Sequence, residues 1–387
     1  MSLLDVKEYD VIVSIGSGNV YGAIVVFEKN AHPLILQSHQ SEFPVKEKIN
    51  AEELSTYMLS ALHKTMQALQ DKHKKRIKNV HVVFASPWFS SFSKLLQVKK
   101  DEAFTVQQKN VEKLIAEEFA EIFKGVTDGG SVVVEKALSH IKLNGYETAN
   151  PYGKTAKTLD VAVYGSMVPS LLREKVESEI YTIIHPKKIL FHTFPFVAWD
   201  VILPLFSPKE DFVFIDIGSE VTDVLIVRRG SIYSLVSFPM GKNHLIRKAA
   251  IHFDTHPELA ASMINLYAND SAEADVKEKV AMLVNAFAEE WGIRFLNSLQ
   301  DSKEGEETFI PQKAFFVSDQ KISNLFSGII NKQIPNTVSL SRDNLSQFVE
   351  FGAGDIPNIF IALSAIYLHN RFVDRKNVYK QAEHLVK

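Results

Sequence analysis

The 387-residue chain contains no cysteine, which excludes disulfides and thiolate metal sites and fits a reducing compartment. It also lacks an apolar run near the roughly 20 residues that a membrane-spanning helix needs. The longest such run, Ile359 to Leu368, has the length of a buried helix. The N-terminus, MSLLDVKEYDVIVSIG, lacks the pattern of a secretory signal. Together these absences predict a cytoplasmic protein.

The net charge and the absence of a hydrolase motif argue against two further classes of protein, those that bind nucleic acid and the hydrolases. A formal net charge of −3 over the whole chain gives no electrostatic basis for binding nucleic acid. No Gly-x-Ser-x-Gly elbow is present to anchor a hydrolase triad. The composition itself, 46% hydrophobic and 23% charged, is typical of a globular protein, and the length suits two or more packed units.

The chain opens with a pattern that occurs twice. Tyr9 to Ser14 is a β-rich run, Gly16 to Asn19 is a glycine turn, and Tyr21 to Phe27 is a second run, followed by a third strand at Pro33 to Ser38. The second copy has its turn at Gly218-Ser219-Glu220. Its strands are predicted at Asp211 to Asp216, Val224 to Val227 and Ser231 to Phe238. A repeated strand–turn–strand–turn–strand pattern predicts a duplicated fold.

A helix with clear boundaries follows the first copy. Asn50 and Glu53 form a capping-box pattern. The apolar stripe of this helix consists of Leu54, Met58, Leu62, Met66 and Leu69. The basic run at its end, Lys72 to Lys78, suits either an acidic partner or lipid head groups, or simply complements the helix dipole. The last interpretation is favoured.

A separate α+β unit is expected at residues 86–180. After a strand at Val80 to Ser86, the pattern predicts a capped helix from Thr105, two strands and a further helix. Those strands are Ser131 to Leu143 and Leu159 to Gly165, and the helix covers about Ser170 to Ile184. Trp88 and Phe89 follow the first strand, where they form either an exposed docking patch or part of the core of this unit.

Beyond the second copy of the opening pattern the chain reads as mainly helical, from His244 through Leu299. A strand at Ala314 to Val317 and a long helix after Pro357 complete it.

Each glycine turn presents backbone N–H groups on one side, a nest that can hold a phosphate. Two nests facing each other could grip a triphosphate, with Asp216 at a strand end holding Mg²⁺. A single strand–Gly–strand hairpin is more often structural than functional. Because the hairpin occurs twice, with Asp216 at a strand end, the functional interpretation is favoured here.

The segment Phe212 to Asp223, FVFIDIGSEVTD, resembles the second phosphate motif of actin-like ATPases, and Val11 to Val20, VIVSIGSGNV, resembles the first. The unit at 86–180 is similar to the insert of the cell-division family FtsA and of the pilus-assembly family PilM. Asn150 to Gly153 is similar to an FtsA segment, and Phe238 to Gly241 sits where that family has its connecting Pro-x-Gly-Gly.

This resemblance implies an α/β, duplicated actin-like (ribonuclease H-like) two-lobed fold. Its first lobe spans 1–85 and 181–208, the inserted subdomain 86–180, the second lobe 209–370, and a C-terminal tail 371–387. The tail has few large apolar residues on any one face, so a membrane anchor there is not expected. The residues implied for binding ATP, with Asp216 also on Mg²⁺, are Ser14, Gly16, Ser17, Gly18, Asn19, Asp216, Gly218, Ser219, Thr222, Gly241 and Ser318.

The chain departs from the family pattern at three places. Ser14 stands where the family has an aspartate, and Ser219 and Glu220 replace two glycines. The stretch Val317-Ser318-Asp319-Gln320 stands where the adenosine motif usually reads Thr-Gly-Gly, so the close approach that glycine allows is lost. The sequence therefore predicts weak or lost ATP binding and a scaffold rather than an efficient ATPase.

The leading hypothesis is an FtsA-like adaptor that recruits partners of a membrane-associated division machine. A PilM-like component of a type IV pilus or secretion platform is the alternative, and an active ATPase is a third. Self-association through the lobes is also expected, and membrane contact only through partners or at the periphery.

Overall fold

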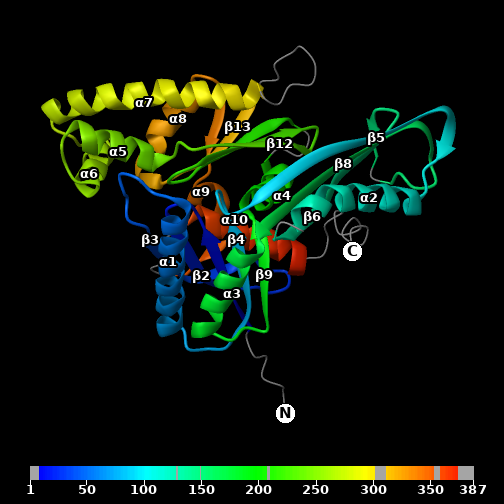
Figure 1. Ribbon diagram of the computed structural model, residues 1–387, viewed down its shortest axis with the longest axis horizontal. Coiled ribbons are helices and arrows are strands. Elements are labelled where there is room, and N and C mark those ends of the chain that lie inside the picture. Colours follow the sequence, from blue (N-terminus) through cyan, green and yellow to red (C-terminus); the bar gives the residue numbers. More distant parts are fainter. Residues whose placement is uncertain are drawn as a thin grey trace.

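The computed structural model describes residues 8–127, 130–148, 150–206, 210–300, 311–352 and 358–373. Two lobes lie one above the other, and a third unit projects from one side of them (Figure 1). Pro357 and residues 374–387 of the expected tail lie outside the described residues. Within the described residues, no helix is both long enough and apolar enough to cross a bilayer.

The first lobe contains a six-stranded sheet in the order β15-β3-β2-β1-β4-β9. β1, β2 and β3 form an antiparallel meander, while β4 runs parallel to β1 and β9 parallel to β4. The bounds are β1 Tyr9–Ile15, β2 Asn19–Val26, β3 Leu34–Glu42, β4 Ile77–Phe84, β9 Lys188–Thr193 and β15 Glu350–Phe351.

The second lobe repeats this topology. Its sheet has the order β12-β11-β10-β13-β14, in which the first three strands form the meander and the last two are parallel additions. The bounds are β10 Phe212–Ile217, β11 Thr222–Arg228, β12 Ser231–Phe238, β13 Lys313–Val317 and β14 Asn336–Ser339. The duplication predicted from the sequence is confirmed, strand for strand.

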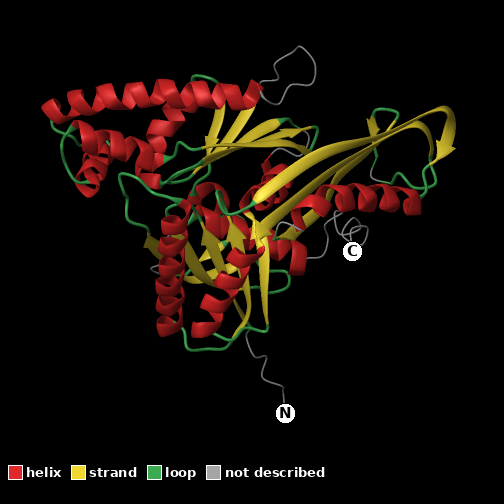
Figure 2. Ribbon diagram, viewed as in Figure 1, coloured by secondary structure: helices red, strands yellow, loops and turns green. Residues whose placement is uncertain are grey.

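Helices cover the outer faces of both sheets (Figure 2). The first lobe carries α1 (Ala51–Lys72), whose capping box from Asn50 and Glu53 and whose buried apolar stripe are both as predicted. The second lobe carries α5 Lys242–His252, α6 Pro257–Ala268, α7 Ala274–Gln300, α8 Ser323–Asn331 and the single-turn helices η1 Gln320–Ile322 and α9 Arg342–Leu345.

Two apolar helices lie between the sheets. α4 (Phe194–Phe206) and α10 (Ile359–Leu368), which continues into the short η2 (His369–Val373), are buried along nearly their whole length. Helices that are apolar on all sides have to be buried on all sides. One hydrophobic cluster accordingly runs from Ile12 and Val25 of the first sheet, through both helices, to Phe214 of the second. The two lobes therefore share a core.

The projecting unit is built on long strands. Its sheet has the order β5-β8-β6-β7, and α2 (Gln108–Thr127) packs on one face of it. The strands are β5 Ser90–Thr105, β8 Thr155–Pro169, β6 Ser131–Leu143 and β7 Tyr146–Glu147. Phe119 and Ile115 of α2 pack with Val161 and Val163 of β8 in a hydrophobic cluster of their own. We call residues 90–169 the insert.

Three sequence expectations about this region need correction. The helix expected from Thr105 begins at Gln108, because Thr105 is the last residue of β5, a strand that the sequence analysis missed. The helix at 170–184, α3 (Ser170–Ile183), packs on the first lobe, where Leu172, Val176 and Ile180 join its core. The insert therefore ends near residue 169 rather than 180. Trp88 is buried in that same first-lobe core and forms neither a docking patch nor part of the insert.

A buried carboxyl group ties the insert to the first lobe. Glu135 of β6 accepts hydrogen bonds from Ser166 Oγ at 2.6 Å and from the backbone N–H of Thr193, at the end of β9, at 2.9 Å. Burial raises the pKa of Glu135 to about 7, although these hydrogen bonds and the positive charge of Arg371 oppose the rise. A second tie joins the insert to the second lobe, where Ser93 Oγ donates to the Tyr233 carbonyl at 2.5 Å.

The structure predicts where the insert can be removed. Ser90 and Met167 are directly paired across β5 and β8, so a short Gly/Ser linker can join them in place of residues 91–166. We expect this variant to be soluble and to unfold in one cooperative transition in thermal denaturation followed by circular dichroism, because the cores of the lobes lose a single buried side chain, that of Tyr164.

The matched control removes residues 86–180. It also deletes α3 and Trp88 from the first-lobe core. Each buried apolar side chain contributes roughly 1.5–3 kcal/mol, against a total stability of about 5–15 kcal/mol, so this variant should not fold. Equal behaviour of the two variants would contradict the boundary at residue 169.

Candidate functional site between the two glycine turns

The two glycine turns have the same local structure. In the first, Gly16 N–H donates to the Asn19 carbonyl at 3.0 Å, and in the second, Gly218 N–H donates to the Val221 carbonyl at 3.0 Å. Each turn joins the first two strands of its sheet, β1 to β2 and β10 to β11. The two sheets thus present equivalent turns at the interface of the lobes.

These turns touch each other. A Cβ atom placed on Gly18 would lie 2.3 Å from the Ser219 side chain, and the Glu220 N–H donates to Ser17 Oγ at 2.9 Å. The space left between the turns is about 30 Å³, counted for the centres of water-sized spheres. One water needs roughly 10–15 Å³ of such space. The enclosed space is therefore the size of about two waters, and the residues in this arrangement do not fit a nucleotide.

The second turn also covers the start of α5. The carbonyls of Gly218 and Ser219 accept the N–H groups of Lys242 at 3.1 Å and Asn243 at 2.8 Å. Free N–H groups at a helix N-terminus are what binds anions in many proteins. Here two of them are used by the turn itself. A Cβ on Gly241 would lie 2.3 Å from the Gly218 carbonyl oxygen, so this close approach requires glycine.

Glu220, one of the departures from the family pattern, is fully paired. Its Oε2 accepts from Arg247 Nη2 at 2.6 Å, and its Oε1 accepts from Arg247 Nη1 at 3.1 Å and from Asn243 Nδ2 at 2.7 Å. An ion pair with two parallel N–H donors is geometrically specific and strong. The carboxylate of Glu220 thus binds the guanidinium group of Arg247, a cation of α5 that lies beside the turn.

Two buried carboxyl groups face each other in the cavity. Asp216 and Asp223 are direct partners across β10 and β11, and both are almost fully buried. Asp223 Oδ1 accepts from Ser86 Oγ at 2.7 Å and from Ser237 Oγ at 2.5 Å. Asp216 Oδ1 has no hydrogen-bond partner among the described residues. Burial, and then the charge of Asp223, raise the pKa of Asp216 well above its ordinary value, and burial raises that of Asp223.

The other side of the cavity is closed by an ion pair. Lys242 Nζ lies 2.6 Å from Asp319 Oδ2. Burial would raise the pKa of Asp319, but the adjacent ammonium group outweighs it and the pKa is lowered. Asp319 occupies the turn where the family resemblance places the glycines that approach adenosine. As with Glu220, a local cation neutralises the acid.

Seven of the eleven predicted site residues line the cavity: Ser14, Gly16, Ser17, Asn19, Asp216, Gly218 and Ser219. The other four do not. Gly18 packs on Ser219 and Gly241 on Gly218, while the Thr222 hydroxyl faces the second-lobe core, where it donates to the Met240 carbonyl at 2.8 Å. Ser318 also lies off the cavity, and its neighbour Asp319 lines it instead.

Sequence reasoning missed Asp223, Tyr21, Ser86, Lys242 and Asp319 as cavity residues. Asp223 could have been found, because a four-residue turn after Ile217 sets it opposite Asp216. Trp88 was missed as a support of the first turn, since its Nε1–H donates to the Gly16 carbonyl at 2.7 Å. Within the described residues, no three acidic or histidine side chains are arranged to hold a metal ion. The Mg²⁺ role of Asp216 stays a prediction.

Comparisons with known proteins identify the fold. No protein-family model matches the sequence, and no curated protein matches it either. Among solved structures, the PilM–PilN type IV pilus biogenesis complex matches with a TM-score of 0.62 and 14% identity over 98% of both chains. The chain has an actin-like fold.

Two weaker likenesses have TM-scores below 0.5. A Bacteroides thetaiotaomicron protein described as having an actin-like ATPase fold and unknown function matches with 10% identity over 94% of this chain and 98% of that one, at a TM-score of 0.43. The ethanolamine utilization protein EutJ of Carboxydothermus hydrogenoformans matches with 11% identity over 93% and 89%, at 0.47. The actin-like, two-lobed fold predicted from the phosphate motifs is confirmed, and the likeness to PilM with it, whereas the resemblance to FtsA stays a prediction.

The close contact between the second turn and the start of α5 gives a stability prediction. We expect Gly241→Ala to destabilise the protein by about 1–3 kcal/mol, because its Cβ has to displace backbone rather than a flexible side chain. The matched control is Gly328→Ala in α8, where a Cβ meets nothing within 4 Å. There alanine should stabilise the helix by roughly 0.5–1 kcal/mol. Urea titration of both variants measures the difference, and an unchanged midpoint for Gly241→Ala would show that the second turn can move away from the start of α5.

Proposed function

We propose that this chain is a scaffold protein that assembles with other proteins of a membrane-associated machine, and that its ATP binding is weak or lost. The main support is the likeness to PilM, which covers 98% of both chains and therefore includes the insert. That structure is of a complex between PilM and a second protein, PilN. A pilus or secretion platform is accordingly the first candidate for the machine served.

The closed cavity is the second line of support. In an actin-like ATPase that binds Mg-ATP, the two phosphate turns have to stand apart by the width of the phosphates. Here they make direct contacts, and the carboxylates of Glu220 and Asp319 are held by Arg247 and Lys242. A bound triphosphate would have to separate the turns and compete with both ion pairs. An efficient ATPase is therefore the less favoured function.

A cell-division role of the FtsA type remains as the second candidate, on the motifs Asn150 to Gly153 and Phe238 to Gly241 alone. Both candidates place the protein in the cytoplasm at the inner face of the membrane. Weak self-association that does not depend on nucleotide is part of the same proposal, since each copy carries two lobes and an insert that can contact the next copy.

Titration calorimetry tests the loss of nucleotide binding. We expect no measurable heat of binding for Mg-ATP at concentrations up to about 1 mM, which corresponds to a binding free energy weaker than about −4 kcal/mol. Micromolar binding would overturn this part of the proposal. Asp216→Ala should then abolish the binding, because Asp216 is one of the two buried carboxyl groups that line the cavity and the one that the resemblance places on Mg²⁺.

Partner capture tests the scaffold role. A tagged full chain and a tagged variant that lacks residues 91–166 are expressed in the native host, cross-linked and purified. We expect the full chain to bring down a membrane-anchored component of a pilus or secretion platform, and the variant to lose it. Capture of division proteins instead would favour the FtsA-type role. Recovery of no specific partner by the full chain would overturn the scaffold proposal.

A further inference from the structure

The end of the first lobe that lies away from the cavity is strongly basic. β1, β4 and β9 are parallel, so they all begin at this end of the sheet, and the loops α1–β4 and α3–β9 meet there. The backbone N–H of Lys187 donates to the Lys78 carbonyl at 2.7 Å, which joins the two loops directly. We call the resulting surface the basic end. It consists of Lys72, Lys74, Lys75, Arg76, Lys78, Lys187 and Lys188.

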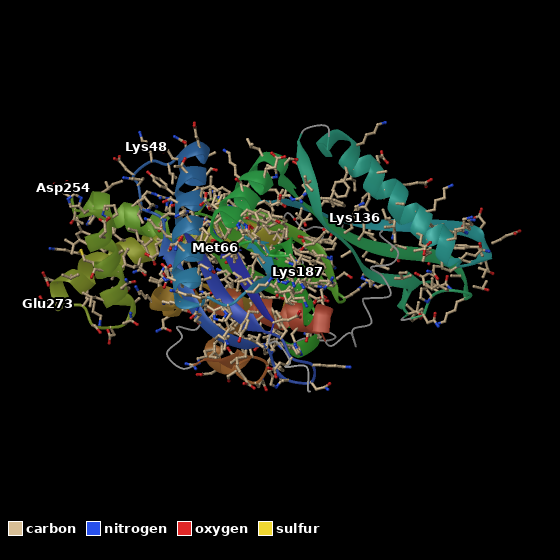
Figure 3. The ribbon with its side chains drawn as sticks, turned by 90° about the horizontal axis from the view of Figure 1, so that it is seen from below. Lys48, Met66, Lys136, Lys187, Asp254 and Glu273 are labelled. Carbon is tan, nitrogen blue, oxygen red and sulfur yellow. The ribbon has the colours of Figure 1, made fainter. Side chains whose placement is uncertain are left out.

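The structure adds two facts to the basic run seen in the sequence. Helix α1 ends at Lys72, so Lys74, Lys75 and Arg76 lie beyond its last turn and are not explained by the helix dipole. Lys187 and Lys188, more than a hundred residues later, are exposed beside them, and Lys187 lies near the middle of the molecule seen from below (Figure 3). The fold thus assembles cations from two segments.

Most of these cations have no carboxylate to pair with. Lys78 pairs with Glu8, and Lys75 donates to the Tyr9 hydroxyl at 3.0 Å. For Lys72, Lys74, Arg76, Lys187 and Lys188 there is no ion pair among the described residues. The remaining nearby acids are Asp71, which accepts from Gln67, Asp10, which accepts from Asn79, and Glu28. The positive charge is also felt by His73, whose pKa is lowered by burial and by Lys75.

A hollow lies at the same end. It has a volume of about 580 Å³, and Lys78, Lys187 and Lys188 are among its lining residues. Its lining also includes the apolar side chains of Phe27, Leu190 and Leu368, and two acidic residues. Of these acids, Glu8 pairs with Lys78 and Asp10 accepts from the backbone N–H of Asn79. Apolar surface beneath a cationic rim suits an amphiphile better than a fully polar anion.

We propose that the basic end docks on the surface of a membrane that contains anionic phospholipid. The chemistry of the cations favours this partner over an acidic protein. Six of the seven are lysines, whose ammonium groups are compact point charges without a fixed donor geometry, whereas specific recognition of carboxylate or phosphate groups on a protein favours arginine with its paired donors. Tyr181, which is 43% exposed in the last turn of α3, adds an aromatic side chain of the kind that anchors proteins at the head-group level.

Docking in this orientation fits the rest of the molecule. The cavity lies at the opposite ends of β4 and β9, and the insert projects sideways (Figure 1). The surfaces available to protein partners therefore stay accessible. The inference goes beyond the proposed function and does not depend on it, because vesicle binding needs neither a protein partner nor a nucleotide.

Vesicle sedimentation tests the proposal with the full chain and a variant, Lys74→Gln/Arg76→Gln/Lys187→Gln/Lys188→Gln. The control variant, Lys109→Gln/Lys124→Gln/Lys279→Gln/Lys332→Gln, removes the same charge from exposed lysines of the insert and second lobe. The vesicles are phosphatidylcholine alone, or phosphatidylcholine with about 30% phosphatidylglycerol. Each cation near an anionic surface strengthens binding roughly fivefold. Thermal unfolding checks that all three proteins are folded.

We expect the full chain and the control variant to bind anionic vesicles and not neutral ones, and the basic-end variant to bind at least tenfold more weakly. Binding should fall as salt is raised, because the charges are exposed and screened. Absence of binding by the full chain at about 50 mM salt, or an equal loss in the control variant, would overturn the proposal. So would binding to soluble polyglutamate through the basic end without binding to vesicles, which would indicate an acidic protein as the partner.

Discussion

The direct contact between the two glycine turns is the constraint on which the site depends. Gly18 of the first turn meets Ser219 of the second at a distance that leaves no room for a Cβ atom. The N–H of Glu220 is bound by Ser17 of the opposite turn. Behind the turns, α4 and α10 fill the space between the sheets with tightly packed apolar side chains. Such a core resists a change in spacing, so the turns are held together from behind as well as by their own contacts.

The departures from the actin-like pattern make sense as a set. A glutamate beside a phosphate nest would repel a nucleotide, and here it binds Arg247 instead. Asp319 replaces a glycine and binds Lys242. Each new acid thus has a local cation, so the site is neutralised from within. Asp216, in contrast, is left with an unpaired buried oxygen, and its pKa is raised because burial and Asp223 disfavour the charged form.

How far the sequence predicted the fold depended on whether the signal was local. The duplicated strands and the capping box at Asn50 are local patterns, and both were predicted correctly. β5 was missed because it is largely exposed and rich in charge, and it is a strand only through its pairing with β8. α4 was missed because an apolar run without periodicity reads equally as strand or helix. The place of α3 in the first lobe depends on tertiary packing alone.

The site shows the same limit. Local motifs predicted seven of the residues that line the cavity. The closure of the cavity could not be predicted in this way, because it arises from contacts between residues about two hundred positions apart, such as Ser17 with Glu220. In a two-lobed fold, a cleft that opens around a ligand can serve as a switch, because the ligand binds the two states unequally. Around this cavity the charged groups already bind one another, so a ligand would have to break the ion pairs of Glu220 and Asp319 before it could bind them. The outer surfaces, the insert on one side and the basic end on another, are then the parts of this molecule left to carry its interactions.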